Sequence, residues 1–362
     1  MSEERRPGRK TSTPAPARRL AAGALLAAAT ALALVMMEGA AFVFNAASGG
    51  QTLPFLVDGE MLRGRPEGRS LGYLDPLLGA VHDPSELATH GHRIFHGFEV
   101  HGDPDDRRAL RIVALGGSTT EAFAGDWPKA LYEECRRRNI PVVLFNGGVS
   151  GHGSAQELLK LLRDGLLLRP DVVVSYDGVN DRGSESGGGD RRRRLAHPVH
   201  SRVFTRLLGE GASPFLPNAV LLLRRAFFSG SSVQGIEWGV PDGLTPAAEW
   251  LLNVRAMNAL ASEFGFHYVG FLQPAFGVGG RRPSREAEAR LNVPDGVRRS
   301  LDAFYGEASR LVPSRRYLVD FTGVLGGRDE HYRDFCHLDE DGNRLVGRAV
   351  FRELESRRWL ER

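Results

Sequence analysis

Four short stretches of the sequence carry residue types that are suited to nucleophilic chemistry. GGSTT (116–120) places a serine after two glycines, directly behind the apolar run RIVAL. Further along come NGGVSG (146–151), YDGVND (176–181) and RDFCH (333–337), which supply backbone amides, a side-chain amide and an acid–histidine pair. A serine hydroxyl, a histidine that takes its proton, a carboxylate that orients the histidine and N–H groups that bind an oxyanion would together make an acyl-transfer site.

The elements that must position these groups are strands that alternate with helices. Short apolar runs typical of buried strands occur at 111–115, 142–146, 171–176, 267–272 and 317–321. Helical signals fall at 126–138, 154–168, 246–264, 285–311 and 340–358. This alternation predicts an α/β fold, a three-layer, doubly wound, flavodoxin-like sandwich around a five-stranded parallel sheet. The residues just after the strands of such a sheet meet in one crevice at its carboxyl edge.

In their order along the chain, the four stretches resemble the blocks of the SGNH, or GDSL-type, hydrolase superfamily of esterases, lipases and carbohydrate deacetylases. The resemblance covers roughly residues 108–358 and includes G-x-N-D in GVND and D-x-x-H in DFCH. The sequence departs from the pattern at Gly117, where many members carry aspartate beside the serine. That departure leaves the hydrogen bonding of the turn open.

The resemblance implies a role for each candidate residue. Ser118 stands at the nucleophile, His337 at the general base, and Asp334 at the acid that orients the histidine. The implied oxyanion donors are the backbone N–H groups of Ser118 and Gly151 and the side-chain amide of Asn180. Asp334 precedes His337 by three residues, and a helical turn would place both side chains on one face.

Each residue taken alone also has a structural interpretation. A serine often caps a helix, asparagine and glycine dominate turns, and a single histidine is most often a surface residue. We interpret Asp181 as structural and Cys336 as core packing, because the side chains of sequence neighbours diverge. His331 is a weaker candidate base, since it has no acid at a matching spacing.

Composition and motifs argue against several other classes of function. The 47 basic residues face 44 acidic ones, and no basic stripe indicates nucleic-acid binding. No phosphate-binding loop follows a strand, and neither the two cysteines nor the histidines have the spacing of a metal site. We therefore expect no cofactor and no metal.

The N-terminus indicates a membrane segment. Leu20 to Met37 is an uncharged apolar run that would span about 27 Å as a helix. Six basic residues precede the run and Glu38 follows it, so the positive-inside rule predicts a cytoplasmic N-terminus and an extracytoplasmic remainder, in the periplasm or at the cell surface. A cleaved signal peptide is the alternative, with small residues at Ala46 and Ser48 near the cleavage position.

We expect five segments along the chain. They are a disordered cytoplasmic tail (1–18), a transmembrane anchor (19–45), a linker (46–70), an irregular extension packed on the main domain (71–107), and the main domain (108–362) with an insertion at 182–245 that contains a helix near 217–227.

The sequence therefore predicts a serine ester hydrolase that removes O-acyl groups from an acylated small molecule, glycan or lipid outside the cytoplasm. An O-acyltransferase with the same triad is one alternative. A catalytically silent carbohydrate-binding or assembly protein is another.

Overall fold

The computed structural model describes residues 16–47, 73–75, 77–82, 87–88, 91–122, 125–182, 218–219, 222, 244–280 and 282–361. The chain divides into two compact units. One, here the N-terminal unit, comprises 1–58 and 204–235; the other, the main unit, comprises 59–203 and 236–362. Most of the predicted tail, linker and insertion lies outside the described residues.

The N-terminal unit contains the helix α1 (Pro16–Ala47). Its segment Ala22–Phe44 is long and apolar enough to cross a membrane or to serve as a signal sequence. Glu38 is buried within this unit, where its carboxylate accepts hydrogen bonds from the backbone N–H of Asn218 (2.7 Å) and of Ala219 (2.9 Å). The described residues of the predicted 217–227 helix are helical.

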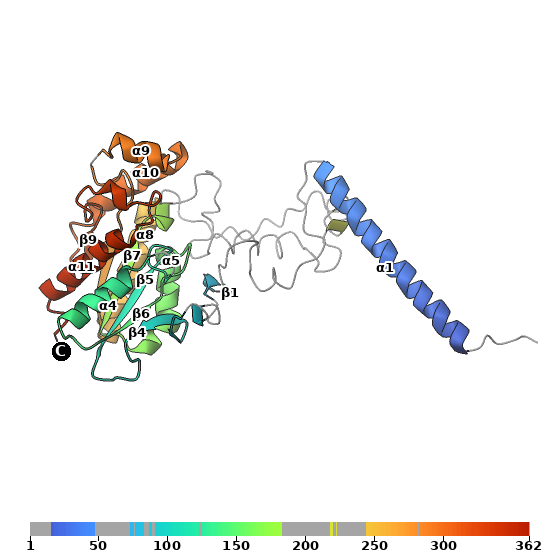
Figure 1. The fold of residues 1–362 in the computed structure, drawn as a ribbon, viewed down its shortest axis with the longest axis horizontal. Coiled ribbons are helices and arrows are strands. Elements are labelled where there is room, and N and C mark those ends of the chain that lie inside the picture. The colour runs from blue at the N-terminus through green and yellow to red at the C-terminus, as the bar shows by residue number, and fades with distance from the viewer. Residues whose placement is uncertain are drawn as a thin grey trace, which may run out of the picture. The chain divides into compact units, whose positions relative to one another are not determined.

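The main unit is built on a parallel sheet, which confirms the predicted α/β fold class (Figure 1). Five parallel strands run in the flavodoxin-like order β6-β5-β7-β8-β9. Their residues are almost all buried because helices cover both faces, which is why they read as continuous apolar runs. Their bounds are Leu110–Gly116 (β5), Val142–Asn146 (β6), Val172–Asp177 (β7), His267–Leu272 (β8) and Leu318–Asp320 (β9).

The extension at 71–107 is more regular than predicted. Its strand β4 (Phe98–His101) pairs antiparallel with β6, and β3 (Ile94–Phe95) pairs with β4, so the sheet has seven strands. β1 (Tyr73–Asp75) and β2 (Gly79–Val81) form a separate antiparallel pair. Strands of two to four residues are too short to show a period in the sequence, so the pairing partner decides their structure.

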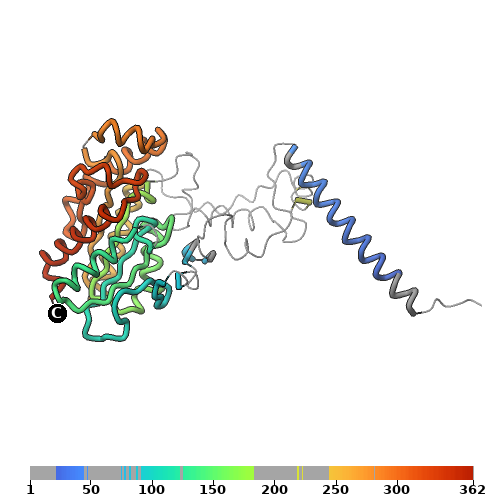
Figure 2. The backbone as a smooth tube through the Cα atoms, in the orientation of Figure 1, coloured from blue at the N-terminus to red at the C-terminus, as the bar shows by residue number. Residues whose placement is uncertain are grey.

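Helices cover both faces of the sheet. α4 (Trp127–Arg137) and α11 (Glu340–Ser356) pack against each other and bury one face, and Figure 2 shows the C-terminal α11 beside α4. α8 (Pro246–Phe264) bridges α5 (Ser154–Lys160) and α10 (Asp295–Leu311) on the other face. Side chains alternate along a strand. Ile112 and Ala114 therefore belong to the core on the α4 and α11 face, and Val113 and Leu115 to the core on the opposite face.

Two predicted helices are broken. The stretch 154–168 is α5 followed by a π-helical turn η1 (Leu161–Gly165) and a 3-10 turn η2 (Leu166–Leu168). The stretch 285–311 is split into α9 (Arg285–Leu291) and α10. Asn292 takes a left-handed conformation (φ 41°) and ends α9, and Pro294 starts α10.

Gly347 of α11 marks the close contact between α4 and α11. A Cβ at this position would lie 2.6 Å from the Ala130 Cβ and 2.7 Å from the Trp127 carbonyl oxygen. We expect Gly347→Ala to lower the free energy of unfolding by about 1–3 kcal/mol, because the helices must separate. Chemical denaturation of the full chain in detergent measures it.

Gly306 in α10 is the matched control, since a Cβ there meets nothing within 4 Å. Gly306→Ala should instead raise stability by about 0.5–1 kcal/mol through helix propensity alone. Equal effects of the two substitutions would contradict the packing argument.

Candidate active site

Ser118 lies in a tight turn at the carboxyl end of β5. The backbone N–H groups of Thr120 and Glu121 both donate to the Gly117 carbonyl (3.0 and 3.2 Å), which closes one turn around the half-buried Ser118. The Trp127 Nε1–H donates to the Thr120 hydroxyl (3.1 Å) and ties the turn to the start of α4. The hydroxyl of Ser118 is therefore presented at the edge of the sheet by a turn that has little freedom.

His337 meets Ser118 at this edge, although 219 positions separate them in the chain. The His337 Nε2 lies 2.8 Å from the Ser118 Oγ, and the Nδ1 lies 2.6 Å from the Asp334 Oδ2. Since the carboxylate accepts, Nδ1 carries the hydrogen, and Nε2 is left to accept from the serine hydroxyl. The structure thus brings the three predicted residues together as a hydrogen-bonded chain.

Asp334 and His337 are held by a bend and not by the helical turn that the spacing predicted. The second carboxylate oxygen, Oδ1, accepts from the backbone N–H groups of Cys336 and His337 at 2.8 Å each. An aspartate that caps its own downstream backbone favours such a turn over a helix. One carboxylate therefore both shapes the loop and orients the imidazole.

The electrostatics of this chain favour a basic histidine. The hydrogen bond to Asp334 raises the pKa of His337 above 6.5, against the opposing effect of burial, and the charges of Asp334 and Glu121 add to the rise. Partial burial would raise the pKa of Asp334, but the side-chain and backbone hydrogen bonds from His337 hold it well below its usual range. Asp334 therefore stays ionised wherever the protein is folded near neutral pH.

The predicted oxyanion donors lie at the ends of the neighbouring strands. Gly151 follows β6 and has φ 79°, a left-handed conformation that favours glycine. In the described part of the chain, neither the Ser118 N–H nor the Gly151 N–H donates to another group. Gly148 lets the loop lie against the serine turn, because a Cβ there would be 2.5 Å from the Glu121 nitrogen.

Asn180 stands beside Gly117, the residue at which the sequence departs from the pattern that it resembles. Its Nδ2 donates to the His152 carbonyl at 2.7 Å, which leaves its second N–H. A Cβ at Gly117 would lie 2.3 Å from that same nitrogen. Any side chain at position 117 would therefore displace the Asn180 amide.

The Asp181 carboxylate holds the Asn180 turn through its hydrogen bonds. Asp181 accepts from the Ser154 N–H (3.0 Å), the Ser154 hydroxyl (2.6 Å) and the Gly178 N–H (3.2 Å). Burial and the nearby charge of Asp177 raise its pKa to about 7. Burial and the same charge also raise the pKa of Glu157, which is 1% exposed. Asp181 is structural in this arrangement, as its place in the sequence predicted.

Two residues near the site differ from their sequence-based interpretation. His331 does have an acid, because its Nδ1 lies 3.1 Å from Asp339, eight residues later at the start of α11. Cys336 is buried in the core, yet its Sγ lies 3.6 Å from the His337 Nδ1 and does not diverge from it. The bend at 334–337 turns neighbouring side chains toward each other.

Asp334, Cys336 and His337 also form the kind of cluster that could ligate a metal, with ligand atoms within 4.8 Å of one another. The donor set does not fit that role well. The Asp334 carboxylate and the His337 Nδ1 are already hydrogen-bonded to each other. Burial also raises the pKa of the Cys336 thiol well above its usual value. The thiolate is the form that binds metals, and here the thiol stays protonated.

Sequence reasoning missed two residues at this edge, Glu121 and His82. The Glu121 carboxylate lies three residues after Ser118 and is 9% exposed. The His82 Nε2 lies 3.5 Å from the Glu121 Oε2. The position of Glu121 directly after the GGSTT block could have indicated a place near the nucleophile. His82 lies in the extension, to which the sequence assigned no purpose.

We expect His337 to titrate above pH 6.5 and Asp334→Asn to lower its pKa, because the amide can no longer stabilise the imidazolium. NMR titration of the imidazole signals measures both values. Glu133→Gln, an exposed substitution on α4, is the control and should leave the His337 titration unchanged. A His337 pKa that is unchanged by Asp334→Asn would contradict the hydrogen-bonded chain.

The chain is similar to several solved structures. No protein-family model and no curated protein sequence matches it. Among solved structures it is similar to a GDSL-like lipase from Bacteroides thetaiotaomicron (14% identity, TM-score 0.39, 76% of this chain and 98% of the other). It is also similar to an acetyl xylan esterase (15%, 0.39, 67% and 98%) and to a lipase/acylhydrolase from Enterococcus faecalis (15%, 0.36, 68% and 96%).

At these identities and TM-scores the similarity does not indicate an activity for this chain. What the site does must be argued from its own geometry.

Proposed function

We propose that the chain is a serine ester hydrolase with Ser118 as its nucleophile. The observation that carries the proposal is the 2.8 Å contact between the Ser118 Oγ and the His337 Nε2, continued at 2.6 Å to Asp334. A half-buried serine at a strand end, a histidine with a raised pKa and an ionised aspartate are the groups that acyl transfer requires.

The geometry supports a two-step reaction. The Ser118 oxygen forms a bond to the acyl carbon while His337 Nε2 takes the hydroxyl proton. The Ser118 and Gly151 N–H groups and the Asn180 amide stabilise the oxyanion, and His337 then gives the proton to the departing alcohol. Water then attacks the acyl carbon while the same nitrogen takes its proton. The bond to the Ser118 oxygen breaks, the acid leaves, and His337 returns the proton to Ser118.

The substrate class follows from where the site would work. We infer that α1 anchors the chain as a single-pass segment, with a cytoplasmic N-terminus and an extracytoplasmic main unit, because basic residues precede the apolar segment Ala22–Phe44. Acylated carbohydrates and lipids are the esters that such a site would meet, and we propose removal of their O-acyl groups. The predicted domain boundaries remain part of this proposal.

Ser118→Ala should lower the rate of hydrolysis of a nitrophenyl acetate by at least about 10³-fold, because no other group takes over the nucleophile's role. Wild-type protein should also be labelled covalently at Ser118 by a fluorophosphonate, and the variant should not. Ser262→Ala, on the exposed side of α8, is the matched control. Equal rates in the Ser118→Ala variant and the wild type would remove the assigned nucleophile.

Asn180→Ala should raise the barrier by about 2.7–4 kcal/mol, a loss of roughly 10²–10³ in kcat with KM little changed, because the amide acts on the transition state. Gly117→Ala should cause a loss of similar kind, since its Cβ would occupy the space of the Asn180 Nδ2. Steady-state kinetics on the same acetate measure both. Unchanged kcat in both variants would exclude Asn180 from the oxyanion site.

A further inference from the structure

Glu121 is a second carboxylate beside the nucleophile that the proposed triad does not use. It lies in the turn that carries Ser118, and the backbone N–H of Ser150 faces its carboxylate and lowers its pKa, against the larger effect of burial. Ser150 directly precedes Gly151, whose N–H is a proposed oxyanion donor. Glu121 therefore connects the nucleophile turn to the loop that would bind the oxyanion.

His82 holds the same loop from the side of the extension. Its Nε2 lies 3.1 Å from the Gly148 carbonyl oxygen, and since a carbonyl only accepts, this nitrogen carries the hydrogen. The same nitrogen is 3.5 Å from the Glu121 Oε2. Glu121 and His82 thus form a second carboxylate–imidazole pair, and both members contact the loop at 148–150.

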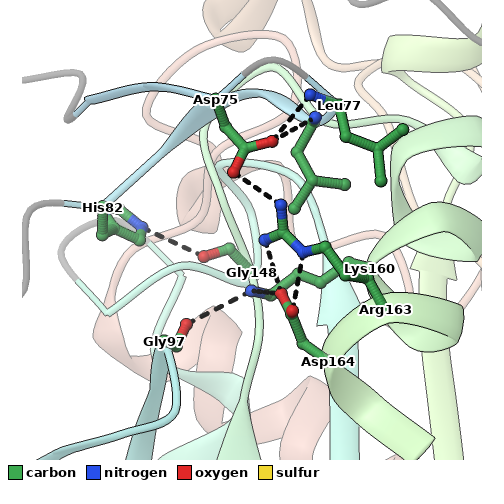
Figure 3. A network of polar contacts seen from close by, with 9 residues as sticks. Asp75, Leu77, His82, Gly97, Gly148, Lys160, Arg163 and Asp164 are labelled. Carbon is green, nitrogen blue, oxygen red and sulfur yellow. Dashed lines mark hydrogen bonds and ion pairs between the residues drawn. The ribbon is translucent and has the colours of Figure 1, made fainter. Parts of the chain in front are cut away.

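The extension is fixed firmly enough to position His82 (Figure 3). Asp75 accepts from the Arg163 guanidinium at 2.6 Å, and the buried Lys160 ammonium donates to the Gly97 carbonyl at 3.3 Å. Figure 3 shows His82 reaching the Gly148 carbonyl, next to the contacts that tie Asp75 to Arg163 and Gly97 to Lys160. The ties to α5 and η1 lie on segments before and after His82, so the histidine is not on a free loop.

A further tie joins the extension to the same loop. Glu99 of β4 accepts from the Asn146 Nδ2 (3.0 Å), and the Asn146 Oδ1 accepts from the Gly148 N–H (3.0 Å). The oxyanion loop is therefore held at Gly148 through both its N–H and its carbonyl. The extension supplies the partner for both contacts, directly through His82 or through Asn146.

We propose that Glu121, paired with His82 of the extension, is a positioning residue of the active site that fixes the oxyanion loop. The proposal rests on the function proposed above. Glu121 does not touch the reacting atoms; it acts through His82, which donates to the Gly148 carbonyl, and through its charge. It follows that the extension at 71–107 supplies one positioning residue, His82, to the active site.

The sign of the electrostatic effect follows from the groups around Glu121. In the described residues those are His82 from the extension, His337 from the C-terminal segment and the Ser150 N–H; Arg333 acts on His337 in the opposite sense. Burial raises the pKa of Glu121 to about 7, so its carboxylate is charged above that pH. Its negative charge favours imidazolium, and without that charge His337 gives up its proton at lower pH.

Glu121→Gln tests the charge, because the amide keeps the shape of the side chain and removes its negative charge. We expect the acid limb of the kcat/KM profile to move to lower pH by roughly 0.5–1 unit, with the alkaline plateau within about threefold of wild type. The His337 imidazole signal in NMR should move by the same amount. Glu133→Gln, exposed on α4, is the matched control and should change neither.

Glu121→Ala and His82→Asn test the positioning. Both should lower kcat by about tenfold with KM little changed, because an oxyanion donor that is no longer held loses part of its effect. Circular dichroism confirms that each variant is folded, and Glu121→Gln should restore most of the kcat lost in Glu121→Ala. His96→Asn, an exposed histidine of the same extension, should leave kcat unchanged.

The outcomes separate this inference from the proposed function. A wild-type kcat in folded Glu121→Ala and His82→Asn overturns the positioning role, and an unmoved His337 titration in Glu121→Gln overturns the charge effect. Failure of the wild type to hydrolyse esters or react with fluorophosphonate overturns the proposed function. The NMR titration of His337 still reads out the effect of Glu121 in that case.

Discussion

The hydrogen bond between Ser118 and His337 is the contact on which the candidate site depends, because it joins two loops 219 positions apart. A parallel sheet makes such a contact feasible. Its register sets Gly116 of β5 opposite Tyr176 of β7, and Asp177 of β7 opposite Leu272 of β8, so these strands end at one edge. Short loops that follow these strands therefore come into contact at that edge. The two helical layers keep the sheet beneath them rigid.

Close approach of backbone to backbone is the second constraint. The loop after β6 reaches the serine turn only because position 148 has no side chain, and Asn180 reaches it only because position 117 has none. Polar groups that are buried in this contact must be paired, and Asp181, with its bonds to Ser154 and Gly178, supplies part of that pairing. Glycines and buried acids are therefore structural requirements of the same arrangement.

Much of the fold and of the candidate site could be predicted from the sequence. The five parallel strands were predicted because strands buried on both faces read as unbroken apolar runs, and the strand-end rule then selected Ser118 and Asn180. Strands β3 and β4 and the break at Asn292–Pro294 were not predicted. A strand of two residues shows no period in the sequence. The residues on both sides of Pro294 have a helical pattern, so the sequence predicted one continuous helix there.

The sequence by itself determined the residue types, their order and their attachment to strand ends, since these depend on local pattern. Tertiary structure alone decided that Asp339 pairs with His331 and that His82 comes to lie beside Glu121. Those contacts join segments whose separation in the chain follows no period. Only the packing of the extension and loops against the sheet selects them.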